Sequence, residues 1–401
     1  MTKILVINDF PIFPIVHGGK VRIFNIYKNI SSRFQITYVC LGDVQKIEEK
    51  KISENFQEIS VPQTYFYKKI IRIAKKLTGC SVDDFVALFF ASSNLQLKTI
   101  LKRQIQDSDI VILCHPYMYP SIKPYIQNQI VVYEALNVEF RLKKSILPES
   151  LLKNFFLHLL KLTEQDLLQR SDLCYAMSEE DKQIFTQIYR VESSKINIAP
   201  NGVDEGFYSD VYAERTFRKE GVIPVPLIIF MGSGHPPNVE AAQQIIKNIA
   251  PNLPDVYFLI AGSVCWMIHN GALGKNVGLT YFITDEEKKE LFRVADIAIN
   301  PMMSGSGTNL KMLDYMAAGL PVVSTAVGAR GIDIENHRHA VVCDIGAFPE
   351  EISHLIHKKD VLAELSRNGR QLVKDHYDWK NIADSMIRDI QPLLDKNQAQ
   401  D

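Results

Sequence analysis

Short apolar runs alternate with helical patterns along the first half of the chain, and this rhythm restricts the fold more than any other feature. The first run, Lys3–Ile7, leads directly into Asn8, Asp9 and a proline-containing loop. Uninterrupted runs of this kind are typical of strands buried on both faces of a parallel sheet. Similar runs occur at Gln35–Leu41, Ile110–Cys114, Ile130–Glu134 and Leu173–Met177, with helical segments such as Val21–Ile30 and Leu151–Gln169 between them. The alternation predicts a doubly wound α/β domain.

The rhythm stops near Pro200–Val225, where glycine, proline and charged residues predict a linker, and then begins again. Its second set of expected strands is Leu227–Met231, Val256–Ala261, Ile297–Asn300, Val322–Ser324 and Ala340–Cys343. Thr284 and Glu287 have the spacing of a capping box at the start of a helix between two of them. A chain of 401 residues is long enough for two such domains, each with its own core. We place them at 1–205 and 206–379, with a final helix at about 380–396.

Composition excludes several classes of protein. The net charge of -1 argues against a nucleic-acid partner, which usually requires a basic excess. Six cysteines without paired spacing predict reduced, mostly buried thiols and no zinc site, as expected in the cytoplasm. No secretory signal precedes the first strand, and no apolar run approaches the roughly 20 residues that span a bilayer. We therefore expect a cytoplasmic protein without an integral membrane segment.

The segment from Asn300 to Thr325 carries the clearest chemical signal. A loop of small residues, Ser304–Thr308, opens into a predicted helix, Asn309–Ala318, which Gly319 closes before the next strand. Such a loop directs unpaired backbone N–H groups and the positive end of a helix dipole at one point, which favours phosphate. Lys311 and Asp314 follow within one turn of each other, so a cation and a carboxylate can face the same ligand. A diphosphate that carries a ribose suits both groups.

A second phosphate-facing loop follows the strand that ends at Met231. Gly232 allows close approach of a ligand to the backbone, and Asn238 is expected to be the N-cap of a helix that starts at Val239. Both loops follow the carboxyl ends of parallel strands, where open sheets bind ligands. The alternative is that Gly232 only permits a tight strand-to-helix turn, and the sequence favours neither interpretation.

Three features of the first domain are candidates for ligand contacts. Gly18–Gly19 opens a helix with Lys20 and Arg22 close by, although an ordinary turn before a helix would also explain the glycines. His115 follows the strand Ile110–Cys114 at its carboxyl end, where ligand contacts are expected, or it is simply a turn residue before Pro116. Asn137 and Glu139 follow the strand that ends at Glu134. They are either ligand-facing groups or polar residues that cap a helix.

The segment 66–77 predicts an amphipathic helix. Lys68, Arg72, Lys75 and Lys76 share one face, Phe66, Ile70, Ile73 and Leu77 share the other, and no acid interrupts them. An interfacial helix on an anionic membrane has this pattern. A solvated basic face above a stripe packed on the core has it too, and this second interpretation is the commoner one.

Taken together, these residues resemble retaining glycosyltransferases of the GT-B fold, family four (glycosyl transferases group 1), over essentially the whole chain. The stretch Pro301–Ser324 is similar to the signature of that family, in the form Ser-Gly-Ser-Gly-Thr-x-x-Lys followed by Met-Ala-Ala-Gly-Leu-Pro-Val-Val. The other matching pieces, in the same order as in the family, are Gly18–Gly19, Asn137–Glu139, Ser178–Asp181, Pro200–Asp204 and Tyr377–Trp379.

The resemblance implies two Rossmann-like domains that face a central cleft. Domain 1–205 would bind mainly the acceptor, domain 206–379 would bind the nucleotide sugar, and the helix at 380–396 would cross back to the first domain. Asp314 holds the family position that contacts ribose, and His115 matches a position near the donor sugar. Ser306 stands where the family has a carboxylate for the donor sugar.

The family's usual Arg and Lys after the first strand of the second domain are also missing, because Gly234–Asn238 contains neither. The resemblance therefore assigns the diphosphate to Lys311, with a contribution from His235 and from backbone N–H groups at 307–309, without metal. His115 and Lys311 are the expected catalytic residues, and Asn137 and Glu139 lie on the acceptor side. The expected donor-binding residues are Gly18, Gly19, Gly232, Ser233, His235, Asn238, Ser306, Gly307, Thr308, Asn309, Leu310, Lys311 and Asp314.

By this resemblance, the chain would transfer a sugar from a UDP-, GDP- or dTDP-linked donor to a glycan, a lipid-linked acceptor or another cytoplasmic acceptor, with no cofactor besides the donor. Peripheral contact with the inner membrane surface would involve 66–77. Two alternatives stay open: a nucleotide-sugar epimerase of the same fold, and a non-catalytic relative that binds nucleotide sugar. A dehydrogenase is disfavoured, because no Gly-x-Gly-x-x-Gly motif follows a strand with a ribose-binding acid about 20 residues later.

Overall fold

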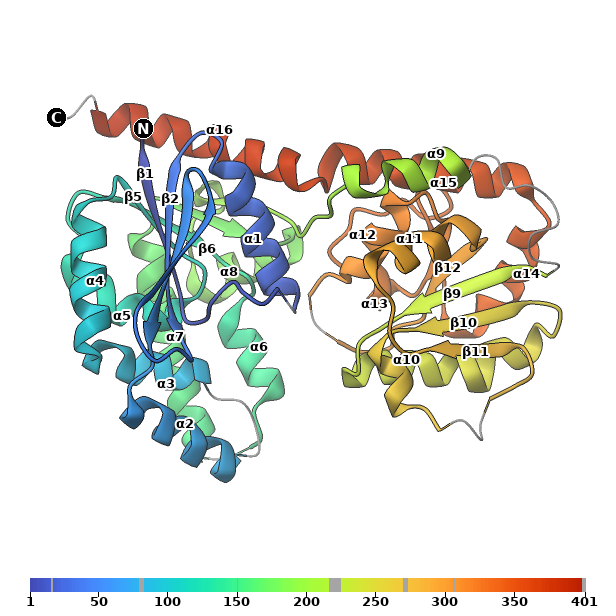
Figure 1. Ribbon diagram of the computed structural model, residues 1–401, viewed down its shortest axis with the longest axis horizontal. Helices are drawn as coiled ribbons and strands as arrows, with labels where there is room; N and C mark the ends of the chain where they lie inside the picture. The colour runs from blue at the N-terminus through green and yellow to red at the C-terminus, as the bar shows by residue number, and fades with distance from the viewer. Residues whose placement is uncertain are drawn as a thin grey trace. The chain divides into compact units, whose positions relative to one another are not determined.

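The computed structural model describes residues 1–15, 17–78, 83–149, 151–215, 225–269, 273–305 and 307–398. The chain forms two compact units, the first comprising 1–200 with 382–401 and the second comprising 201–381. Each unit is an α/β layer structure around one sheet (Figure 1). Ser306, one of the expected donor-binding residues, lies outside the described residues.

The first unit contains an eight-stranded sheet in the order β3-β4-β2-β1-β5-β6-β7-β8. All of its neighbouring strands pair in parallel except β3 with β4. The strands are β1 Lys3–Asn8, β2 Gln35–Gly42, β3 Glu48–Ser53, β4 Phe56–Pro62, β5 Ile110–Leu113, β6 Ile130–Glu134, β7 Leu173–Ala176 and β8 Ile196–Ile198. The helices are α1 Gly18–Ile30, α2 Tyr65–Thr78, α3 Asp83–Phe90, α4 Leu95–Gln106, α5 Tyr119–Ile122, α6 Glu139–Ile146, α7 Leu151–Arg170 and α8 Glu179–Tyr189.

The second unit contains a six-stranded parallel sheet in the order β11-β10-β9-β12-β13-β14. The strands are β9 Leu227–Met231, β10 Tyr257–Ala261, β11 Val277–Thr280, β12 Ile297–Asn300, β13 Val322–Ser324 and β14 Val341–Val342. The helices are α9 Ser209–Arg215, α10 Pro236–Gln244, α11 Asp285–Val294, α12 Leu310–Ala317, α13 Ala326–Ala329, α14 Phe348–Ile356 and α15 Lys359–His376. The long helix α16, Trp379–Gln398, belongs to the first unit from Ile382 on, where Tyr175 donates its hydroxyl to the Met386 carbonyl at 3.2 Å.

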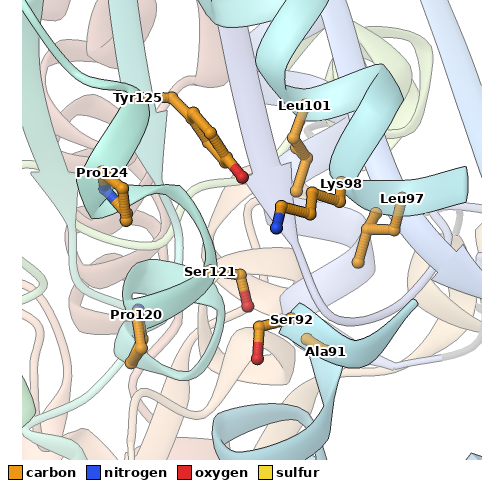
Figure 2. A pocket seen from close by; sticks show the side chains of 9 residues that line it. All are labelled: Ala91, Ser92, Leu97, Lys98, Leu101, Pro120, Ser121, Pro124 and Tyr125. Carbon is orange, nitrogen blue, oxygen red and sulfur yellow. The ribbon is translucent and has the colours of Figure 1, made fainter. Parts of the chain in front are cut away.

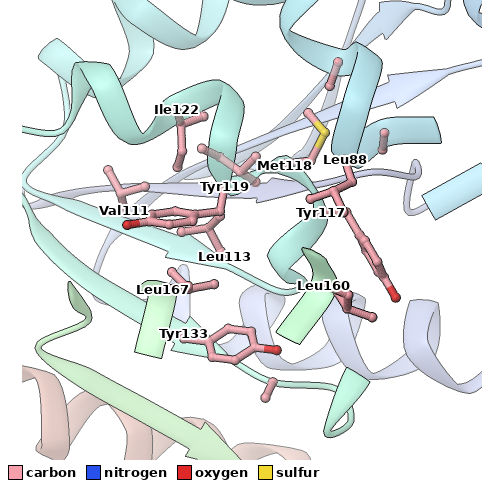
Figure 3. Packing of buried hydrophobic residues seen from close by; sticks show 14 of the residues in the cluster. Leu88, Val111, Leu113, Tyr117, Met118, Tyr119, Ile122, Tyr133, Leu160 and Leu167 are labelled. Carbon is pink, nitrogen blue, oxygen red and sulfur yellow. The ribbon is translucent and has the colours of Figure 1, made fainter. Parts of the chain in front are cut away.

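Burial on both faces explains why the strands read as continuous apolar runs. In β9, Ile228 and Phe230 belong to one hydrophobic cluster, whereas Leu227 and Ile229 belong to another. Because neighbouring side chains point to opposite faces of a strand, both faces of this sheet are covered. In the first unit, Leu113 of β5 and Tyr133 of β6 pack with Leu160 and Leu167 of α7 (Figure 3). The predicted α/β fold with two Rossmann-like domains is confirmed.

Several local predictions need correction. The expected linker 200–225 contains a short 3₁₀ turn, Gly206–Tyr208, and helix α9. The helix after Gly18–Gly19 begins at Gly18 itself, with His17 as its N-cap. The capping box of Thr284 and Glu287 is confirmed at the start of α11. Strands β3, β4, β8 and β11 were not predicted.

None of the helices in the described part of the chain combines the length and apolar character that a bilayer-spanning segment needs.

Candidate functional site

The strand order of each sheet defines where a ligand is expected. In the second unit, the chain moves from β9 outward to β10 and β11, and then returns to the other side of β9 with β12. In the first unit, β1 and β5 are the corresponding neighbours. Open α/β sheets bind ligands outside the carboxyl ends of the strands at such switch points. The loops after β9 and β12, and those after β1 and β5, are therefore the candidate ligand-binding regions.

In the second unit, Lys311 joins the two predicted phosphate loops. Lys311 lies in the first turn of α12, which begins after the β12 loop, and its ammonium group donates a hydrogen bond to Asn238 Oδ1 at 2.6 Å. Asn238 in turn donates from Nδ2 to the carbonyl and hydroxyl oxygens of Ser233, at 3.2 and 3.1 Å. Ser304 adds a second link, because its hydroxyl lies 2.6 Å from Glu240 Oε2 on α10.

The surroundings of Lys311 lower the pKa of its amine. The ammonium nitrogen lies 4.4 Å from the centre of the Phe230 ring and 3.9 Å from the Met302 sulfur. These apolar neighbours desolvate the amine and lower its pKa to about 7, although the side chain is not fully buried. A lysine in this state can accept a proton when an anion binds beside it.

The glycine-rich loop before α12 presents backbone donors. Gly305 and Gly307 have φ angles of 122° and 74°, in the left-handed range that favours glycine. Asn309 is the N-cap of α12, but its side chain points elsewhere and donates to the Gly328 carbonyl at 3.2 Å. Within the described residues, the backbone N–H groups of Gly307, Thr308 and Asn309 have no acceptor. They are available to an anion at the helix N-terminus.

Arg330 also contacts this loop, through hydrogen bonds to its backbone carbonyl oxygens. Its guanidinium donates to the carbonyl oxygens of Gly305 and Gly307, at 2.9 and 3.3 Å. These contacts orient the carbonyls toward Arg330 and bring a second cation to the loop. Arg330 was not predicted as a site residue, because its position after Gly328–Ala329 matches no binding motif.

Asp314 lies one turn after Lys311, and both of its carboxylate oxygens already have a partner in the protein. Tyr208 donates its hydroxyl to Oδ1 at 2.9 Å, and the Lys288 ammonium lies 2.8 Å from Oδ2. Lys288 also lies 5.4 Å from the centre of the Tyr208 ring, so the three side chains form one cluster. The carboxylate stays partly exposed, with a side-chain accessibility of 27%. Each oxygen has one partner, which leaves acceptor capacity for a hydroxyl pair of a ligand.

The loop after β9 differs from its prediction. Asn238 is not the N-cap of α10, because the helix begins two residues earlier at Pro236 with His235 as the N-cap. Proline lacks the N–H group that would be unsatisfied at that position, so it starts the helix well. Packing favours glycine at position 232, since a Cβ there would make a tight contact of 3.0 Å with Asn238 Cβ. The side chains of Ser233 and His235 are exposed.

In the first unit, His115 forms the centre of a polar cluster at the switch point. Its Nδ1 lies 2.8 Å from Asn8 Oδ1 and 3.2 Å from Asp9 Oδ1, both at the end of β1. Its Nε2 lies 3.6 Å from Glu139 Oε1. Burial lowers the pKa of His115, but the contacts with Asp9 and Glu139 outweigh burial and raise the pKa above its ordinary value. The sequence did not single out Asn8 and Asp9, although they directly follow the first strand.

Glu139 is a buried carboxylate that several donors fix in place. Tyr117 donates its hydroxyl to Oε2 at 2.6 Å, and Asn137 donates from Nδ2 to Oε1 at 3.3 Å. Neither Asn137 nor Glu139 caps helix α6, whose N-cap is Val138. Their capping interpretation is therefore wrong, and the two side chains belong to the His115 cluster.

A second buried carboxylate, Glu164, accepts hydrogen bonds from the first backbone N–H groups of α6. Glu164 of α7 accepts hydrogen bonds from the backbone N–H groups of Glu139 and Phe140, at 3.0 and 3.1 Å. Tyr133 and Tyr189 donate their hydroxyls to the same carboxyl. Burial nevertheless raises the pKa of Glu164 to about 7.

Gly18 and Gly19 lie near this cluster. The Phe10 ring lies 5.3 Å from the His17 ring, which precedes the glycines, and 5.7 Å from the His115 ring. A Cβ on Gly19 would meet His17 at 3.6 Å, an ordinary contact, so packing alone does not demand glycine there. The described residues contain no group of three or more His, Cys, Asp or Glu side chains arranged to hold a metal ion.

A surface pocket lies elsewhere in the first unit, between α4 and α5 (Figure 2). None of the predicted site residues lines it. The lining residues are Ala91, Ser92, Leu97, Lys98, Leu101, Pro120, Ser121, Pro124 and Tyr125. We do not include it in the candidate site, because it is not formed by the loops at the switch point.

The chain is similar to known proteins in fold and, over part of its length, in sequence. The chain is similar in structure to Anabaena HepE in complex with UDP, with a TM-score of 0.69 and 13% sequence identity, over 98% of this chain and 100% of that one. This likeness shows the GT-B fold. Residues 225–358 match the family described as glycosyl transferases group 1, so the resemblance to these enzymes is confirmed for this part of the chain.

Two curated relatives share part of the sequence. One is an uncharacterised protein in the cps region of Klebsiella pneumoniae, 25% identical over 179 residues, which cover 40% of this chain and 45% of the relative. The other is D-inositol 3-phosphate glycosyltransferase of Segniliparus rotundus, 24% identical over 248 residues, which cover 58% of this chain and 54% of the relative. The matches span about half the length of each relative.

Proposed function

We propose that the protein is a cytoplasmic, retaining glycosyltransferase that moves a sugar from a nucleotide diphosphate sugar to an acceptor, without a metal ion. The observation that carries this proposal is the contact between Lys311 and Asn238, which joins the loops after β9 and β12 at the switch point of the second unit. The match of 225–358 to group 1 glycosyltransferases supports it.

In this proposal the diphosphate binds at the N-terminus of α12. Backbone N–H groups at Gly307, Thr308 and Asn309 surround it, and Lys311 supplies the charge that the family usually takes from the loop after β9. Negative charge grows on the diphosphate as the sugar leaves, and preorganised donors stabilise such charge best. Asp314 binds the ribose hydroxyls, with Lys288 and Tyr208 holding its carboxylate in position. The UDP in the HepE structure makes UDP-sugars the first donors to test, before GDP- and dTDP-sugars.

The reaction replaces one bond at the anomeric carbon by another on the same face. The bond between this carbon and the leaving phosphate oxygen breaks, the bond to the acceptor oxygen forms, and a phosphate oxygen takes the acceptor proton. No protein nucleophile is required. We assign the site around His115 to the donor sugar and the acceptor, because it offers a histidine with a 12% exposed side chain between Asp9 and Glu139.

The acceptor is a glycan or a lipid-linked glycan in this proposal. The relative in the cps region of Klebsiella pneumoniae supports a role in polysaccharide synthesis. Helix α2, which contains 66–77, is the proposed point of peripheral contact with the inner membrane surface.

The test is a panel of UDP-, GDP- and dTDP-sugars incubated with the purified protein and a membrane or lysate acceptor fraction. We expect one nucleotide series to bind and its sugar to be transferred, or slowly hydrolysed without acceptor. Conversion of the sugar on the nucleotide without transfer would instead identify an epimerase. Nucleotide binding without turnover on any donor would identify the non-catalytic alternative.

A further inference from the structure

Helix α2 has two apolar stripes with different surroundings. Tyr67, Ile70 and Ile71 face inward, where Tyr67 is 3% exposed and the two isoleucines pack against the core. Phe66 and Ile73 lie on the outward side and are 54% and 50% exposed. The sequence pattern placed Ile70 and Ile73 on one face, but the helix separates them. A surface helix usually buries its large apolar residues against the core. The exposure of both Phe66 and Ile73 therefore suggests a surface that binds something.

Basic residues surround the outward pair. Lys69, Arg72 and Lys76 are all exposed and share this side of α2 with Phe66 and Ile73. Lys68 and Lys75 are paired with Asp43 and Asp83, respectively. Among the described residues, no carboxylate lies within ion-pair distance of Lys69, Arg72 or Lys76. The outward side therefore carries three uncompensated positive charges and no acid.

The apolar surface continues beyond α2. The Phe66 ring lies 5.7 Å from that of Phe90 at the end of α3, and the neighbouring Phe89 stacks on Phe155 of α7 at 6.3 Å. Phe155 is 59% exposed. We call this surface the α2–α7 face and define it by Phe66, Lys69, Arg72, Ile73, Lys76 and Phe155.

A continuous run of ring contacts leads from this face to the His115 cluster. Phe155 contacts Phe156 at 5.9 Å, and Phe156 contacts Phe85 at 5.3 Å. Phe85 contacts Tyr117 at 6.1 Å, and Tyr117 contacts His115 at 5.8 Å. Exposure falls along this run from Phe155 to the buried Phe85 and Tyr117. A partner bound to the α2–α7 face therefore lies a few aromatic side chains away from the candidate site of the first unit.

We propose that the α2–α7 face docks on an anionic lipid bilayer. Aromatic and aliphatic side chains that alternate with basic ones, without acids, provide both the apolar burial and the attraction to lipid phosphates that interfacial binding requires. A second copy of the chain is a poor occupant, because self-association through this face would bring its positive charges together. The consequence for the reaction rests on the proposed function: the acceptor is anchored in the bilayer and reaches the His115 cluster from the docked side.

The test measures binding of the full chain to vesicles by flotation. Vesicles of phosphatidylcholine mixed with phosphatidylglycerol should bind the protein, vesicles of phosphatidylcholine alone should bind it much more weakly, and salt should reduce the binding. Changing Lys69, Arg72 and Lys76 together to Gln should weaken binding about 100-fold, since each basic residue near an anionic surface contributes about fivefold. Phe66→Ser with Ile73→Ser should also lower binding.

Helix α4 provides matched controls in the same unit. Lys98, Lys102 and Arg103 are exposed there, and Leu95 is 76% exposed. Changing the three basic residues to Gln, or Leu95→Ser, should leave vesicle binding unchanged. Equal binding by the α2 and α4 variants, or no binding of the wild type to anionic vesicles, would overturn the proposal. So would a dimer in solution that Phe66→Ser with Ile73→Ser converts to a monomer. Nucleotide affinity, measured without lipid, tests the proposed function separately and should not change in these variants.

Discussion

The Lys311 ammonium group lies 2.6 Å from Asn238 Oδ1, and this hydrogen bond joins the first turns of α10 and α12 across 73 residues of the chain. The two helices follow β9 and β12, the strands that flank the switch point of the second sheet. Lys311 lies in the first turn of α12, close to the helix N-terminus, where backbone N–H groups are free within the described residues. Charge and donors for a diphosphate thus meet at one place, although the loop after β9 contains no basic residue other than His235.

Nucleotide affinity should depend on pH through Lys311. Burial lowers the pKa of this amine to about 7, so below that pH the lysine is already charged when the diphosphate arrives. Above it, binding must bring a proton, and the dissociation constant should rise by up to about tenfold per pH unit. Lys311→Arg keeps its charge and should flatten this dependence between pH 7 and 9. Calorimetric titrations of UDP would show this, and an equally steep rise in the arginine variant would contradict the role of Lys311.

Asp314 should provide the preference for ribose over deoxyribose. If its carboxylate accepts the ribose hydroxyls, wild type should bind UDP more tightly than 2′-deoxy-UDP by about tenfold, the value of one hydrogen bond to a charged group. Asp314→Asn should lose most of this preference. Asp285→Asn, an exposed acid at the start of α11, is the matched control and should retain it. An unchanged preference in Asp314→Asn would rule out the assignment to ribose.

His115 should affect turnover more than nucleotide binding. The residue lies in the first unit with Asp9 and Glu139, whereas the proposed diphosphate site lies entirely in the second unit. His115→Ala should lower kcat by about 100-fold, the usual size of a positioned catalytic contact, and change the dissociation constant of UDP by less than about threefold. His158→Ala, an exposed histidine on α7, is the control. A loss confined to nucleotide affinity would remove His115 from the catalytic site.

The stability of the first unit should decrease between pH 5 and 8 because of Glu164. Its pKa is raised by burial from an ordinary value near 4.5 to about 7, so the folded state binds this proton more tightly than the unfolded state. The contribution to stability is complete below pH 4.5 and is lost as the pH rises through 7. It amounts to about 3 kcal/mol at most.

Glu164→Gln should flatten this pH dependence in thermal unfolding of the full chain. Asp166→Asn is the matched control on the same helix, because Asp166 is a half-exposed carboxylate paired with Lys123. The control should keep the wild-type slope. Identical slopes in wild type and Glu164→Gln would show that Glu164 does not hold this proton.

Periodicity and apolar runs predicted most strands of the two sheets, because strands buried on both faces, such as Ile110–Leu113 and Leu227–Met231, leave an uninterrupted apolar signal. The edge strand β3 was missed, since Glu48–Ser53 is largely exposed and has no such run. The glycine loop and Lys311 were visible as a local motif. Lys288 and Tyr208, the partners of Asp314, were not visible, because they approach α12 only through the strand order and helix packing of the folded unit. Asn238 was an expected donor-binding residue, but its contact with Lys311 was not predicted for the same reason.

The most direct test of the proposed site is the affinity for UDP of Lys311→Ala beside that of Lys247→Ala, an exposed lysine of the same unit. A hydrogen bond to a charged group is worth about 1.5–3 kcal/mol, so Lys311→Ala should bind the nucleotide about 10- to 100-fold more weakly at pH 7. Lys247→Ala should bind it as wild type does. If both variants bind UDP like wild type, the diphosphate does not bind at the N-terminus of α12 and the account of the second unit is wrong.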